Sequence, residues 1–120
     1  MGLYVASVRK RYAVNASGTF GVLAPGQSRK RVVATVYRPN PERSARSFYR
    51  LARMYGAVTE EVVDKQGRKT MTAFFTRDAK ITFRPVSTSD LTPTVTIYLP
   101  QPSFGLVRYQ HLHFQTTGDE

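Results

Sequence analysis

The sequence predicts an α+β domain, in which one helix packs on a twisted antiparallel sheet of about five strands after a basic N-terminal segment that is β-rich or partly ordered. Two patterns lead to this prediction. Apolar residues recur at three- and four-residue steps between residues 40 and 56, and apolar and polar residues alternate after residue 57. At 120 residues the chain has the length of one domain. We divide this domain (1–120) into a lead-in (1–38), a helix (39–56) and a sheet (57–115).

The lead-in contains three strand-like pieces separated by breaks rich in glycine, proline and polar residues. The pieces are LYVASVRKRYAV, TFGVLA and RVVATVYR, and the breaks are NASG and APGQSRK. The pattern predicts either further strands or an incompletely ordered basic arm, and both interpretations stay open at this point.

The helix is predicted from the segment NPERSARSFYRLARMYG, which has recognisable ends. Asn40 is suited to the N-cap, Pro41 to the first helical position, and Gly56 to the residue just past the end. The apolar stripe consists of Ala45, Phe48, Tyr49, Ala52 and Tyr55, and arginines at positions 43, 46, 50 and 53 occupy the remaining surface. We expect a helix that packs on the core and has a basic outer side.

After Gly56 the pattern has period two, which is typical of strands. The segments are AVTEEVV, KTMTAFFT, KITFRPV, TVTIYL and LVRYQHLHF. The turns DKQGR and RDA are short and polar, which favours mostly antiparallel pairing.

The net charge of +10 lies entirely in the first half of the chain. Residues 1–56 carry eleven Lys and Arg against one acidic residue, whereas residues 57–120 carry seven of each sign. This asymmetry indicates a surface for a polyanion, with nucleic acid first and an acidic protein second. A merely solubilising role for the arginines is the alternative.

Composition also limits the chemistry. The chain has no cysteine, which excludes disulfides and thiolate metal sites, and its eight acidic residues are scattered. No apolar run approaches the length of a membrane-spanning segment. We therefore expect neither a metal nor another cofactor, and no membrane-spanning segment.

Alternation along the last three predicted strands collects polar side chains on one sheet face. They are Lys80, Thr82, Arg84, Thr94, Thr96, Tyr98, Tyr109, His111 and His113. This set contains no carboxylate, whereas a merely solvated face would mix acids with bases.

Metal-free cleavage of RNA needs such a set of side chains. One imidazole takes the proton from a 2′-OH, and a second protonates the leaving 5′-oxygen. Lys80 and Arg84 would stabilise the charge that builds on phosphorus, and hydroxyls would orient the phosphate. We therefore predict His113, His111, Arg84 and Lys80 as catalytic residues. Ordinary structural roles for the two histidines are the alternative.

The stretch from FFTRDAKITFRPVSTSD to the strand QHLHF resembles the C-terminal toxin domains of bacterial contact-dependent growth inhibition and related polymorphic toxin systems. The matching positions are Asp78, residues 81–87, Ser89, Pro93, Val95, Ile97 and residues 110–114. Arg84, Ser87, Ser89 and His113 match the polar positions of that pattern. His111 stands where the pattern has lysine, and RDAK replaces its usual Asp-Gly turn.

The resemblance implies the fold of the barnase/EndoU/colicin E5/RelE ribonuclease group and a toxin that cleaves RNA, with tRNA expected. It implies a domain secreted as part of a larger cell-surface carrier and delivered to the cytoplasm of a target cell. Its partners would be RNA and a cognate immunity protein, and we expect a monomer apart from the immunity complex. The substrate-binding residues predicted on both grounds are Thr82, Ser87, Ser89, Tyr98, Tyr109, Arg46 and Arg50.

Two other functions stay open. A non-enzymatic nucleic-acid-binding protein of phage or plasmid origin would use the same arginines and aromatic residues. An ADP-ribosyltransferase toxin is suggested by VYR at 36–38 and STS at 87–89, but the glutamate expected on a late strand is missing, because Glu120 lies beyond it.

Overall fold

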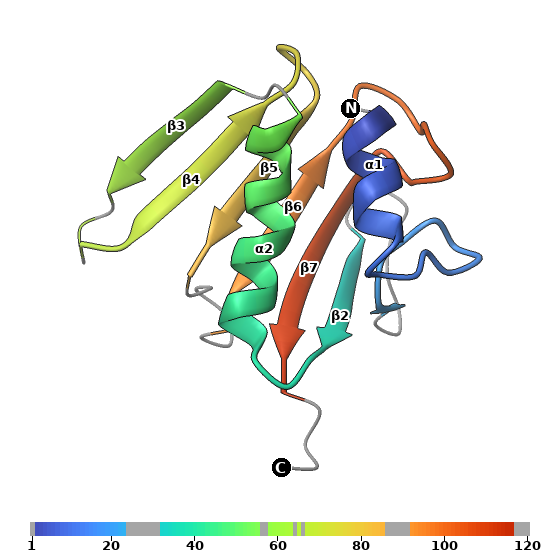
Figure 1. The fold of residues 1–120 in the computed structure, drawn as a ribbon, viewed down its shortest axis with the longest axis horizontal. Helices are drawn as coiled ribbons and strands as arrows, with labels where there is room; N and C mark the ends of the chain where they lie inside the picture. Colours follow the sequence, from blue (N-terminus) through green and yellow to red (C-terminus); the bar gives the residue numbers. More distant parts are fainter. Residues whose placement is uncertain are drawn as a thin grey trace.

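In the part of the chain that the structure describes, two helices lie on the same face of one sheet of seven strands (Figure 1). This arrangement comes from a computed structural model that describes residues 2–23, 32–55, 58–63, 65, 67–85 and 92–116. The helices are α1 (Gly2–Arg9) and α2 (Pro41–Met54). The α+β class predicted from the sequence is therefore confirmed.

The strand order is β1-β2-β7-β6-β5-β4-β3. The strands are β1 (Val22–Leu23), β2 (Val33–Tyr37), β3 (Val58–Val63), β4 (Lys69–Phe74), β5 (Lys80–Arg84), β6 (Thr94–Tyr98) and β7 (Tyr109–Gln115). The run from β3 to β7 is the predicted antiparallel part, each strand pairing with the next. The prediction of about five strands was too low, because β2 pairs with β7 in parallel and β1 adds to β2.

The N-terminal piece LYVASVRKRYAV was wrongly predicted as a strand, since its first part forms α1. Tyr4, Val5 and Val8 share one side of this helix and are buried, whereas Leu3 is 74% exposed. The β-branched valines favour a strand locally, but packing against α2 overrides that preference. The other two pieces do contain strands, β1 and β2.

Helix α2 begins as predicted. The Asn40 side chain accepts a hydrogen bond from the Arg43 backbone N–H at 3.1 Å, which caps the first turn. The buried side is formed by Ala45, Phe48, Tyr49, Leu51 and Ala52. Tyr55 was wrongly placed in this stripe, because the helix ends at Met54 and Tyr55 is a half-exposed C-cap.

The core is organised around Phe48, whose ring is fully buried. Four aromatic rings surround it at centroid distances of 5.2 to 6.2 Å, and they belong to Tyr4, Tyr12, Phe20 and Phe114. The Tyr4 hydroxyl also donates a hydrogen bond to the Phe48 carbonyl oxygen at 2.8 Å. One side chain of α2 therefore contacts α1, the segment that follows α1, and β7.

The segment between α1 and β1 is attached to the sheet by a buried amide. Gln110 of β7 accepts a hydrogen bond from the Phe20 N–H at 2.9 Å and donates one to the Gly18 carbonyl at 3.3 Å. Nearby, Gly21 has φ +83°, and a Cβ there would lie 2.3 Å from the Thr35 carbonyl oxygen. This close approach requires glycine.

Replacing Phe48 by alanine should lower the free energy of unfolding by about 3–5 kcal/mol, since it removes the ring at the centre of the aromatic cluster. Met54→Ala in the same helix is the control, because this side chain is 75% exposed and should change stability little. Urea unfolding followed by circular dichroism measures both. Equal effects would contradict the central role of Phe48.

Tyr4 should make stability fall at alkaline pH. Burial raises the pKa of its hydroxyl well above the ordinary value, with a smaller contribution from Tyr12. Below about pH 10 the tyrosine is neutral in both states. Above that pH the unfolded chain loses this proton while the folded chain keeps it, so stability decreases as pH rises. Tyr4→Phe should unfold more easily at neutral pH and lose less stability between pH 9 and 11; parallel pH curves would contradict this.

Candidate functional site

The polar side chains of β5, β6 and β7 lie on the sheet face opposite the helices. Their alternate neighbours Phe83 and Phe114 pack against α2 through Tyr49 and Phe48. Directly opposite residues on neighbouring strands share a face, and the register forms three such rows. The rows are Lys80–Tyr98–Tyr109, Thr82–Thr96–His111 and Arg84–Thr94–His113. We call these nine residues the histidine face.

The two histidine rings are in contact at the centre of this face. Their centroids are 4.8 Å apart and the rings are nearly perpendicular, at 84°. The Thr92 hydroxyl is 3.0 Å from Nδ1 of His113, and the Thr96 hydroxyl is 2.6 Å from Nδ1 of His111. Each ring is thus oriented by a threonine.

Burial differs across the histidine face. His113 is 8% exposed and Thr94 is 1% exposed, although no described helix covers this side of the sheet. His111 is half-buried and Arg84 is exposed. The face therefore runs from a buried imidazole to an exposed guanidinium.

One hydroxyl on this face has no hydrogen-bond partner among the described residues. Thr94 Oγ1 is buried and makes no hydrogen bond with the described residues. Thr94 stands between His113 and Arg84 in the register. A buried hydroxyl without a partner costs stability.

A cation and aromatic rings form the end row of the face. Lys80 Nζ lies 4.9 Å from the Tyr98 ring centroid and 5.9 Å from that of Phe74. The Tyr98 and Tyr109 rings meet edge to face with centroids 5.1 Å apart. Such rings are flat apolar surfaces next to a cation.

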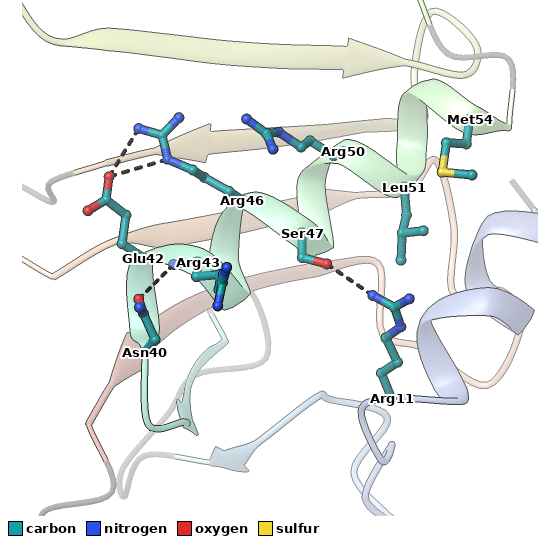
Figure 2. Close-up of a pocket in the computed structure, with 9 residues that line it drawn as sticks. All are labelled: Arg11, Asn40, Glu42, Arg43, Arg46, Ser47, Arg50, Leu51 and Met54. Carbon is teal, nitrogen blue, oxygen red and sulfur yellow. Dashed lines mark hydrogen bonds and ion pairs between the residues drawn. The ribbon is translucent and has the colours of Figure 1, made fainter. Parts of the chain in front are cut away.

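Two of the predicted substrate-binding residues lie elsewhere. Arg46 and Arg50 project from α2, on the helix side of the sheet (Figure 2). The Arg46 guanidinium carbon lies 5.5 Å from the ring centroid of Phe83, a core residue. The sheet separates both arginines from the histidines. Ser87 and Ser89 lie outside the described residues.

Three residues that were not predicted from the sequence lie on or beside the histidine face. Glu60 of β3 shares the face through its register with Thr72, so a carboxylate is present after all. It lies four strands from His111, or about 19 Å. Thr35 of β2 is beside His113, which only the parallel pairing decides. Thr92, which contacts His113, precedes β6. Strand alternation therefore could not predict on which side of the sheet it lies.

Within the described part of the chain, no group of three or more His, Cys, Asp or Glu residues could hold a metal ion. No described helix is both long and apolar enough to cross a membrane. Comparisons with protein-family models, with curated proteins and with solved structures find no match for this chain.

Two isosteric substitutions should have opposite effects on stability. Thr94→Val removes a buried hydroxyl without a partner, and should raise the free energy of unfolding by about 1 kcal/mol. Thr96→Val removes the hydrogen bond to His111 and should lower it by about 1 kcal/mol. Chemical unfolding of both variants measures this difference. Destabilisation of similar size in both would show that the Thr94 hydroxyl is bonded in solution.

Proposed function

We propose that this chain is a metal-independent ribonuclease. The observation that supports it best is the pair of contacting imidazoles, each oriented by a threonine, on a face that also carries Arg84 and Lys80. These groups supply proton transfer and positive charge, which are the two needs of 2′-OH attack on a phosphodiester. Orientation by hydrogen bonds keeps the rings in one geometry for that reaction.

The reaction divides between the two histidines. His113 takes the proton from the 2′-OH, whose oxygen attacks phosphorus and displaces the 5′-oxygen. His111 donates a proton to that leaving oxygen, so the products are a 2′,3′-cyclic phosphate and a 5′-OH. Arg84 and Lys80 stabilise the charge on the phosphorane. Threonine hydroxyls lie within hydrogen-bond distance of Nδ1 in both rings.

The proposal extends to the biological setting implied by the resemblance. The chain would be a toxin domain of a bacterial contact-dependent system, delivered by a carrier into a target cell, with tRNA as substrate and an immunity protein as inhibitor. The net charge of +10 supports a polyanionic substrate.

Nucleic-acid binding without catalysis is the second candidate. It is supported by the arginines of α2, which lie on the other side of the sheet from the histidines. This function predicts salt-sensitive RNA binding, no cleavage, and no effect of replacing His113.

The purified protein should cleave tRNA in the presence of EDTA and leave 2′,3′-cyclic ends. His113→Ala should lower the rate by about 10²–10⁴-fold, since it removes one acid–base group. His111→Ala should lower it as well. Denaturing gels and end-group analysis measure cleavage, and circular dichroism checks that each variant is folded.

Three results would contradict this function: cleavage that stops in EDTA, full activity of folded His113→Ala, or RNA binding with no turnover. In cells, expression of the wild type should yield discrete tRNA fragments and arrest growth. Expression of His113→Ala should do neither.

A further inference from the structure

Helix α2 presents a row of four arginines on the side away from the core. They are Arg43, Arg46, Arg50 and Arg53, which we call the arginine ridge. At 100° per residue they fall within about 80° of the helix circumference, and at 1.5 Å per residue they extend over about 15 Å. Their spacing along the axis is thus a regular 4.5 to 6 Å, by the same rise of about 1.5 Å per residue.

Most of this charge is not neutralised. Glu42 pairs with Arg46 at 3.0 Å. The guanidinium groups of Arg43, Arg50 and Arg53 make no hydrogen bond or ion pair with the described residues. All three are exposed. Unpaired cations spaced along one line attract a repeating anion.

The surface beside the ridge is hollow and extends the positive charge. A hollow of about 680 Å³ is lined by Arg43, Arg46 and Arg50 together with Arg11 from the segment after α1 (Figure 2). Arg11 is held there by its hydrogen bond to the Ser47 hydroxyl at 3.2 Å. Glu42 is the only acidic residue among the described residues that line it.

A phosphodiester chain fits this surface better than a single carboxylate does. Guanidinium groups bind phosphate oxygens through paired N–H donors, and each stays charged at every physiological pH. Four of them in a row match a ligand whose charge repeats along its length. Leu51 and Met54 at one end of the hollow provide apolar contact for a sugar or a base.

We propose that the arginine ridge is a second RNA-binding site, which holds the backbone of a long RNA on the opposite side of the sheet from the histidine face. The role of the bound RNA as a substrate rests on the proposed function; binding itself does not. An RNA that reaches both sites has to pass around an edge of the sheet. A short RNA at the histidine face leaves the ridge empty.

Binding is tested with a fluorescent 2′-O-methyl RNA of about 30 nucleotides, which lacks the attacking hydroxyl and is not cleaved. The variant is Arg43→Gln with Arg50→Gln, because glutamine matches arginine in helix propensity. The control is Lys65→Gln with Arg77→Gln, which removes the same charge from exposed turn residues. In the ridge variant, the slope of log affinity against log salt should become shallower by about 1.4, or 0.7 for each lost phosphate contact. The control should keep the wild-type slope.

Cleavage assays provide the second measurement. The ridge variant should raise KM for a long RNA and leave kcat unchanged, and it should cleave a dinucleotide like the wild type. Equal changes in ridge variant and control would overturn the proposal, as would an unchanged slope. The proposal would also be overturned if polyglutamate displaced the labelled RNA as effectively as unlabelled RNA does. That result would indicate that the ligand of the ridge is an acidic protein.

The two proposals fail separately. If the wild type does not cleave RNA but the salt slope becomes shallower in the ridge variant and not in the control, the ribonuclease proposal is wrong and the ridge proposal stands. If His113→Ala is inactive but the ridge variant binds RNA like the wild type, the ridge is wrong and the ribonuclease stands.

Discussion

The fold depends on the burial of Phe48 of α2 among rings from three other parts of the chain. Tyr4 comes from α1, Tyr12 and Phe20 from the segment that follows, and Phe114 from β7. Burial of apolar surface is the main source of stability in a domain of this size. Because these contacts all lie on one side of the sheet, both helices pack there and the other face carries no described helix.

Packing of both helices on one side of the sheet decides which side chains each surface presents. The face without helices keeps its polar rows, and the register of β6 with β7 places both histidines opposite threonines. The helix side carries the arginines, because a helix that buries one side in the core turns its other side to solvent. The arginines of α2 and the two histidines are therefore on opposite sides of one sheet, although Arg46 and Arg50 were predicted from the sequence to share a site with His113.

Much of this arrangement could be predicted, because strand alternation and helical spacing are local properties. The polar face from Lys80 to His113 follows from period two alone, and the start of α2 follows from Asn40 and Pro41. The parallel pairing of β2 with β7 joins residues almost eighty positions apart, and no local pattern specifies it. The approach of Thr35 to His113 was unpredictable for that reason.

The sequence by itself determined the α+β class, α2, the five strands from β3 to β7 and the side to which the side chains of β5, β6 and β7 point. These features depend on residues close together in the chain. Only the tertiary structure decided that residues 2–9 form a helix, that Thr94 is buried with no hydrogen-bond partner among the described residues, and that the sheet separates the arginine ridge from the histidine face. Those features depend on packing between distant segments, which can override local preference.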